Sequence, residues 1–216
     1  MLGASFSFSA LATGTLVSGE FSRHFDFPYQ LSTDAVLGAV LSPVEFDPGI
    51  GSTGFGEFGP DAVIHGYRRA DRSQAALAVT QLLGPRARAT QVFIDLNVAW
   101  VHVHDWPNNG EVPLQRAGAT ANSWGYRVAV AATYNSVFGG VNLTPRVAYA
   151  QDVDGTTPAP TATFLDGRRV VSIGATFDYL ERIQVDLALT RFSGAGDANQ
   201  LRDRDFAQAR FTYFFK

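Results

Sequence analysis

The sequence predicts an all-β protein: an antiparallel transmembrane β-barrel with short periplasmic turns and long outer loops, of which this chain supplies about nine strands. Three observations carry this prediction. Apolar and polar residues alternate along segment after segment, the connections are alternately short and long, and aromatic residues gather near both ends of the segments. Successive side chains of a strand point to opposite faces, so the alternation gives each strand one apolar face, which a membrane barrel turns toward lipid.

The last segment shows the alternation most clearly. Residues 206–215 read Phe-Ala-Gln-Ala-Arg-Phe-Thr-Tyr-Phe-Phe, so Phe211, Tyr213 and Phe215 share one face while the other face is largely polar. Outer-membrane barrels commonly end their last strand on an aromatic residue, and Lys216 departs from that pattern. One such strand also fits a soluble core, but the preceding segments repeat it.

Toward the N-terminus the same period of two recurs, first clearly and then less cleanly. The clear segments are 183–190, 171–179, 141–150, 124–134 and 92–100, and the less clear ones are 72–83, 14–25 and 2–10. Short connections are expected at 180–182, 135–139 and 84–90, and long ones rich in Gly, Pro, Asn and Asp at 193–204, 152–168 and 105–122. Alternating short turns and long loops are typical of transmembrane barrels.

Aromatic residues on the apolar faces give an independent criterion. With the C-terminus in the periplasm, one group lies near the periplasmic rim and a second near the outer rim, as membrane interfaces favour. The periplasmic group is Tyr134, Tyr179, Tyr213 and Phe215, and the outer group is Trp100, Trp124, Tyr126 and Tyr149. A soluble β-sandwich or lipocalin-like barrel, which would bury the same apolar faces, is the alternative.

Composition limits the function classes. No stretch of the 216 residues approaches the roughly 20 consecutive apolar residues of a membrane helix. The net charge of −3 gives no basic footprint for nucleic acid, and the absence of cysteine excludes disulfides and thiolate metal sites. Motifs for nucleophilic, metal-dependent or nucleotide-dependent catalysis are missing, so we expect neither an enzyme nor a cofactor.

Residues 1–216 are expected to form a single barrel domain that is the C-terminal part of a longer barrel, because the N-terminal residues lack a signal peptide and the strand count is odd. Residues 26–70 interrupt the strands as a long loop. A short helix over 33–41 is expected there, with Val36, Leu37, Val40 and Leu41 at helical spacing behind a Ser32 or Thr33 cap. The following Gly-rich stretch is interpreted as a lid or plug that gates the pore through Phe46, Phe55 and Phe58.

Charged residues recur on the faces expected to line the pore. They are Asp95, Arg127, Arg146, Asp178, Asp186 and Arg210. We interpret them mainly as cross-strand pairs that solvate the wall, with a charge ladder that orders permeating solutes as the sharper hypothesis. His102 and His104 share a face but lack further ligands, so no metal site is expected.

Several stretches resemble the C-terminal portion of the Domain-of-Unknown-Function 1302 family, large Gram-negative proteins thought to be outer-membrane barrels. The most specific are Pro145-Arg-Val-Ala-Tyr-Ala-Gln-Asp-Val-Asp-Gly155 and Asp203-Arg-Asp-Phe206, supported by Gly3–Phe6, Gly14–Ser22 and Leu83-Gly-Pro85. The resemblance implies an inner-membrane transporter of the resistance-nodulation-division type and a periplasmic partner. It supplies no catalytic residue.

The expected function is a passive channel or docking pore for small hydrophobic compounds in the bacterial outer membrane, working with that inner-membrane transporter. Outer-membrane lipid, lipopolysaccharide and the barrel-assembly machinery are the other expected partners. The run Arg202-Asp203-Arg204-Asp205 is interpreted as a salt network that stabilises its loop, or as a contact to lipopolysaccharide. A structural or adhesive barrel and a soluble lipocalin-like binder are the alternative functions.

Overall fold

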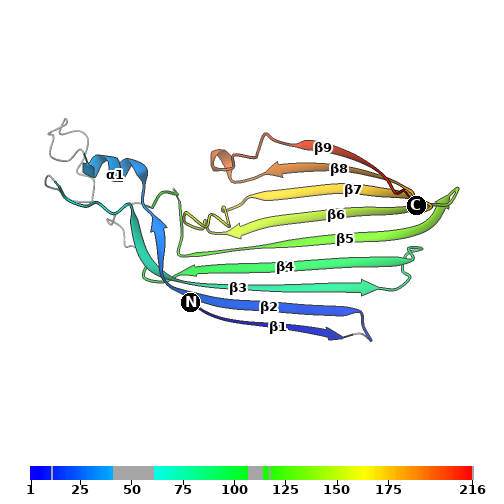
Figure 1. Ribbon diagram of the computed structural model, residues 1–216, viewed down its shortest axis with the longest axis horizontal. Helices are drawn as coiled ribbons and strands as arrows, with labels where there is room; N and C mark the ends of the chain where they lie inside the picture. Colours follow the sequence, from blue (N-terminus) through cyan, green and yellow to red (C-terminus); the bar gives the residue numbers. More distant parts are fainter. Residues whose placement is uncertain (11, 41–60, 107–113, 117, 216) are drawn as a thin grey trace.

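The computed structural model describes residues 1–10, 12–40, 61–106, 114–116 and 118–215. Within these residues the chain forms one nine-stranded antiparallel sheet, one short α-helix and one 3₁₀ turn (Figure 1). The strands are β1 (Leu2–Ala10), β2 (Thr15–Gln30), β3 (Tyr67–Leu83), β4 (Gln91–Val103), β5 (Asn122–Phe138), β6 (Val141–Asp154), β7 (Arg169–Tyr179), β8 (Ile183–Ser193) and β9 (Phe206–Tyr213). Helix α1 covers Thr33–Val40, and η1 covers Gly196–Ala198.

The strands follow one another in chain order, and each pairs with the next. The predicted all-β, antiparallel fold is therefore confirmed. The sheet is not closed into a barrel: within the described part of the chain, β1 and β9 each pair on one side only. Both outer strands thus present a free hydrogen-bonding edge.

The connections differ in length between the two ends of the sheet. The turns at 84–90, 139–140 and 180–182 lie at the end that holds the C-terminus (Figure 1). The opposite end holds α1 and the connections that lead from β4 to β5, from β6 to β7 and from β8 to β9. We call these the short-turn end and the long-connection end.

Several strands extend beyond their predicted limits. Strand β2 continues to Gln30 and β3 begins at Tyr67, both inside the segment expected to be a loop. A register shift between His24 and Phe27 breaks the alternation there, which explains the missed extension. Similarly, β5 runs through the expected turn at 135–139, because the register shift near its end lets the strand continue to Phe138.

Helix α1 forms where the spacing predicts a helix, but it buries a different side. Ala35 and Ala39 are its buried residues, while Leu37 and Val40 are exposed. At its start, the backbone N–H and the hydroxyl of Thr33 both donate to Oε1 of Gln115, at 2.7 and 3.0 Å. Gln115 thus ties the start of the helix to the connection between β4 and β5, and the buried residues of the helix are alanines instead of the expected apolar stripe.

The sheet has little core of its own. A small apolar cluster lies at the long-connection end, where Tyr29, Ala70 and Val103 are buried and Trp106 and Leu114 pack against them. Most of the sheet carries its large apolar side chains on an exposed face instead. The fold therefore positions two long faces, and their chemistry decides what the protein can do.

Candidate functional site: the polar face and the loop that covers it

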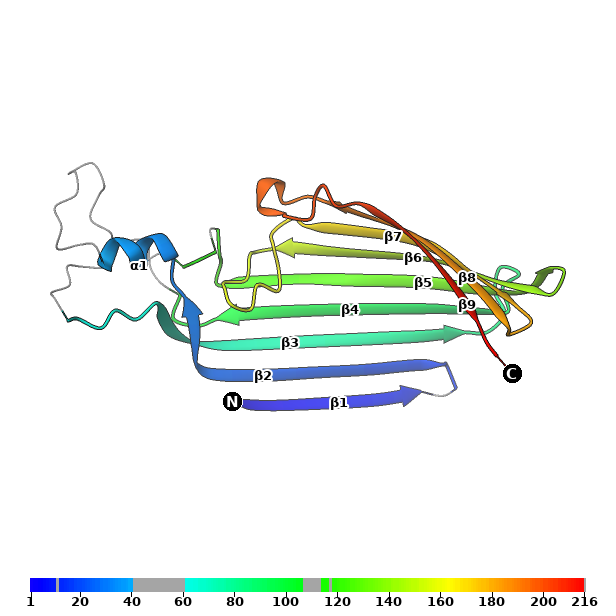
Figure 2. The ribbon, with the colours of Figure 1, turned by 45° about the horizontal axis from the view of Figure 1, so that its top comes forward.

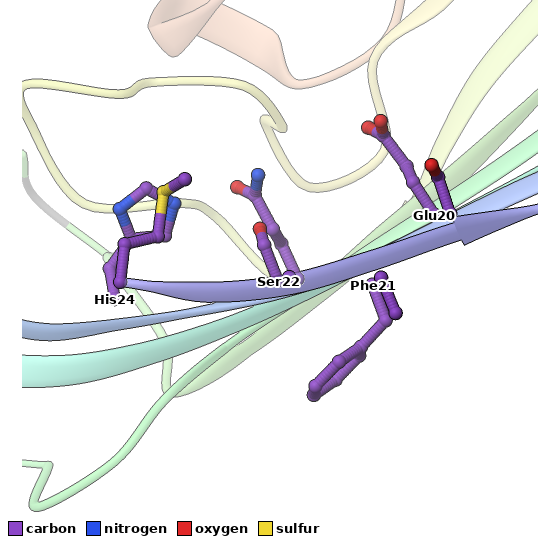
Figure 3. A pocket seen from close by; sticks show the side chains of 9 residues that line it. Glu20, Phe21, Ser22 and His24 are labelled. Atoms are coloured by element: carbon purple, nitrogen blue, oxygen red, sulfur yellow. The ribbon is translucent and has the colours of Figure 1, made fainter.

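The register assigns every strand residue to one of two faces, because directly opposed residues of neighbouring strands point to the same side. One transverse row links Phe211, Val185, Phe177 and Leu143 across β9 to β6, and we call this side the apolar face. The adjacent row links Arg210, Asp186, Thr176 and Thr144, which defines the polar face. Figure 3 shows the same division on β2, where Glu20, Ser22 and His24 lie on one side of the strand and Phe21 on the other.

All of the charges expected to line a pore share the polar face. The register places them one per strand from β4 to β9: Asp95, Arg127, Arg146, Asp178, Asp186 and Arg210. Between them the face is built largely of small residues, for example Ala148, Ser172, Gly174 and Ala188. Small side chains leave space above this face of the sheet.

The charge network centres on Asp186, which is buried. Arg146 donates from Nη1 to Oδ2 of Asp186 at 2.6 Å and from Nη2 to Oδ1 at 2.9 Å. The hydroxyl of Thr176 donates to the same carboxylate at 2.7 Å. Arg210 lies directly opposite Asp186 on β9. Two guanidinium groups therefore flank one carboxylate.

The other charges have different surroundings. Asp95 accepts hydrogen bonds from Thr80, at 2.8 Å, and from Asn97. Asp178 accepts from the backbone N–H of Glu181 at 3.2 Å and so shapes a short turn. Among the described residues, Arg146–Asp186 is the one ion pair within the predicted set, so cross-strand charge pairing holds for one pair only.

A groove of about 420 Å³ lies on the polar face beside β1. Glu20, Ser22 and His24 of β2 line it (Figure 3), together with Gln74 of β3. The imidazole, the amide and the hydroxyl give this part of the face hydrogen-bonding groups of both kinds.

Residues 155–168, which we call the strap, form a compact loop between β6 and β7. Thr156 and Thr157 are buried in it, Thr157 with no exposed surface. The backbone N–H of Thr157 donates to the carbonyl of Phe164 at 3.1 Å, and the N–H of Phe164 returns a bond to Oγ1 of Thr157 at 3.0 Å. The carboxylate of Asp152 accepts from Arg168 Nε at 2.7 Å. The strap is thus closed on itself by its own hydrogen bonds.

The strap folds inward over the polar face. Its Thr157 hydroxyl lies 2.9 Å from the hydroxyl of Ser123, a polar-face residue at the start of β5. The ring of Phe164 lies over Gly125, where an added Cβ would approach its Cε1 to 3.0 Å. In Figure 2 the connection between β6 and β7 accordingly turns back over the ends of β5 and β6.

The strap also reaches across several strands. The carbonyl of Ala159 accepts from the backbone N–H of Gln30, the last residue of β2, at 3.2 Å. Arg116 donates from Nη1 to the carbonyl of Thr157 at 3.1 Å. Burial, together with the charge of Arg168, lowers the pKa of the Arg116 guanidinium, while Asp152 opposes that shift. The strap therefore bridges from β6 and β7 to the end of β2.

The apolar cluster lies on the same face as the strap, at the long-connection end. Tyr29, Ala70 and Val103 belong to the polar face at the long-connection end, and the guanidinium of Arg72 lies 4.2 Å from the ring centre of Phe27. The long outer loop predicted over 152–168 carried no prediction that it folds inward over the sheet. The Thr156-Thr-Pro-Ala-Pro160 run, which is short in charge for an exposed loop, was the available signal.

The predicted aromatic groups lie on the apolar face, at opposite ends. Trp100 and Trp124 are directly opposed on β4 and β5 near the long-connection end. Beside them, the hydroxyls of Tyr149 and Tyr126 both reach Oε1 of Gln151, at 2.9 and 3.4 Å. Toward the short-turn end lie Tyr134, Tyr179 and Tyr213, followed by Phe215, whose ring centre is 4.8 Å from that of Tyr213.

In the described part of the chain, no helix has the length and apolar character needed to cross a membrane. Residues 1–215 match the family described as protein of unknown function DUF1302. The chain belongs to the DUF1302 family. No curated protein and no solved structure matches it. The match spans all nine described strands and the strap, and it confirms the family resemblance found in the sequence.

Two further predictions for this DUF1302 chain concern the gating phenylalanines and the pair His102 and His104. Phe46, Phe55 and Phe58, expected to gate the pore, lie outside the described residues. The rings of His102 and His104 lie 4.5 Å apart, and each bonds a neutral side chain: Asn122 at 2.8 Å for His102 and Ser73 at 2.8 Å for His104. Across the described residues, no group of three or more metal-ligating side chains is present.

Proposed function

We propose that this DUF1302 chain forms the wall of a β-barrel in the bacterial outer membrane and serves as a passive conduit for small compounds. The division of the sheet into an apolar and a polar face carries the proposal. On the apolar face, Ile173, Leu189 and Phe211 are 55%, 64% and 66% exposed. So large an apolar surface is a liability in water and is favourable against lipid.

Membrane insertion requires that the edges of the sheet be paired. Strands β1 and β9 have free edges in the described structure, and unpaired backbone groups are costly in hydrocarbon. In the membrane these edges would pair with one another or with further strands of a longer barrel. The barrel-assembly machinery is the proposed route of insertion.

The polar face then lines the lumen, with the strap as a constriction at its mouth. The position of the strap supports this orientation, because a loop folded over one face marks that face as the inside. A lipocalin-like binder would need the apolar face inside, and the strap covers the other one. In transmembrane barrels, loops that fold inward narrow or plug the lumen.

A patch at the short-turn end of the polar face supports the proposed permeant class. Leu16, Leu82 and Phe93 lie there and are all exposed. An apolar patch at the entrance to an otherwise polar lumen suits small hydrophobic compounds. We propose that a periplasmic partner and an inner-membrane transporter of the resistance-nodulation-division type deliver such compounds to this end, since the sequence carries no nucleotide-binding motif of its own.

Shortening the strap tests the conduit directly. Replacing residues 158–163 by two glycines keeps the bonded pair Thr157 and Phe164 but removes the part that reaches β2. The variant should give larger single-channel conductance in planar bilayers. Replacing residues 200–203 by two glycines is the matched control, because that connection lies at the same end and makes no bond to the strap in the described structure.

Heat-modifiable migration on gels establishes that both variants are folded before conductance is compared. A wild-type protein that forms no channels, or a strap variant whose conductance equals that of the control, would refute the proposal.

A further inference from the structure

A second groove lies on the apolar face, away from the lumen. It measures about 530 Å³ and runs over β7, β8 and β9 near the long-connection end. Val171, Ile173, Leu189 and Ala207 form its apolar floor, and Arg191 and Asp205 lie at its end. An apolar groove with an exposed arginine at its end has the shape of a site for an anionic amphiphile.

A pair of arginines strengthens the positive end of this groove. Arg191 is opposed to Val171, and Arg169 is opposed to Ser193, so the two arginines are diagonal neighbours on one face. Their Cα atoms are therefore roughly 7–8 Å apart. The Arg191 side chain is 80% exposed, and its Nε lies 3.6 Å from Oδ2 of Asp205.

Asp205 does not neutralise the positive charge of both arginines. Its other oxygen, Oδ1, accepts from the backbone N–H of Phe192 at 2.8 Å, so the carboxylate is held against β8. This end of the sheet thus carries one carboxylate, paired with Arg191, and two exposed arginines, Arg169 and Arg191. A phosphate placed between the guanidiniums can accept charge-assisted hydrogen bonds from both.

The register sets the depth of the site. Arg191 shares a transverse row with Val171 and Tyr149, a member of the outer aromatic group. The next row toward the short-turn end contains Ile173, Leu189 and Ala207 of the groove. The cations therefore lie level with the aromatic residues that mark the membrane interface, and the groove extends into the apolar band.

We propose that this surface binds a phosphorylated glycolipid of the outer leaflet, lipopolysaccharide, with a phosphate on Arg169 and Arg191 and an acyl chain in the groove. The inference rests on the proposed membrane location, with the long-connection end outward. It assigns these arginines to lipid recognition and leaves Arg210, on the polar face, to the lumen.

Binding of labelled deep-rough lipopolysaccharide to the detergent-folded protein tests the site. The Arg169→Ala/Arg191→Ala double variant should bind about tenfold more weakly, as expected when a charge-assisted hydrogen bond is lost. The Arg169→Lys/Arg191→Lys variant should retain part of the affinity. Arg182→Ala, which removes an exposed arginine from the short-turn end of the same hairpin, is the matched control and should bind as wild type does.

Competing probes identify the ligand chemistry. Enzymatic removal of the phosphates from the lipopolysaccharide should weaken its binding to wild type to the level of the double alanine variant. Equal binding by the double variant, an equal loss in Arg182→Ala, or equally strong binding of inorganic phosphate alone would overturn the site.

A separate flotation assay with lipid vesicles distinguishes the two proposals. A wild-type protein that fails to insert overturns the proposed function and this site with it, whereas normal insertion with unchanged lipopolysaccharide binding by the double variant overturns the site alone.

Discussion

Arg146 and Asp186 form a bidentate ion pair that spans the intervening strand, β7. Arg146 lies on β6 and Asp186 on β8, and their two hydrogen bonds measure 2.6 and 2.9 Å. The guanidinium crosses β7 at Gly174, where an added Cβ would approach Arg146 Cζ to 3.0 Å. Three neighbouring strands are thereby joined by side chains as well as by their backbone ladders, in the bidentate geometry that favours arginine.

Replacing Gly174 should destabilise the protein by disturbing this pair. In Gly174→Ala the new methyl group would meet the guanidinium of Arg146 and lie 2.7 Å from the carbonyl oxygen of Leu187. Overpacking of this kind costs roughly 1–3 kcal/mol, which should lower the urea midpoint of unfolding measured by gel mobility. Gly84→Ala is the control, since its methyl group would meet no described atom within 4 Å. Equal midpoints for the two variants would contradict the prediction.

Arg210 should influence ion selectivity while Arg191 should not. The two arginines lie on adjacent strands but on opposite faces, Arg210 beside Asp186 and Arg191 beside Val171. Arg210→Ala removes a positive charge from the face proposed to line the lumen, so the reversal potential in a salt gradient should shift toward cation selectivity. Arg191→Ala should leave it unchanged. A shift in both variants, or in neither, would show that the polar face does not line the conducting path.

A cysteine pair should lock the strap to the sheet. The chain contains no cysteine, so introduced thiols have no competing partners. In Ser123→Cys/Thr157→Cys the two thiols replace hydroxyls that lie 2.9 Å apart, and mild oxidation should close a disulfide. Gel mobility with and without reductant measures it. The Ser123→Cys/Thr161→Cys variant should stay reduced, and its oxidation to the same extent would contradict a strap fixed on Ser123.

The three tryptophans should report two different environments. Trp100 and Trp124 lie together on the apolar face, whereas Trp106 packs against the buried cluster at the long-connection end. In a Trp106→Phe variant, lipids brominated close to the headgroup should quench fluorescence more than lipids brominated at mid-chain. The complementary Trp100→Phe/Trp124→Phe variant should be quenched by neither. Strong quenching of Trp106, or none of the pair, would argue against the proposed orientation in the membrane.

Sequence reasoning identified the strands and their faces because these depend on local geometry. The alternation in 206–213 or 171–179 requires only that consecutive side chains point to opposite sides of a strand, so each charge from Asp95 to Arg210 could be assigned to a face without knowing its neighbours. Prediction failed where that periodicity is interrupted. The register shift between His24 and Phe27 concealed the end of β2, and the one near Phe138 concealed the end of β5.

The sequence by itself determined the all-β class, the antiparallel order of the strands, the two faces and the family. The tertiary structure alone decided that Arg146 pairs with Asp186 across β7 and that the strap turns inward to Ser123 and Gln30. The physical reason is the range of the contacts. A side-chain period of two is set by adjacent peptide units, whereas the path of a loop is set by hydrogen bonds to residues far away in the chain, which no local pattern records.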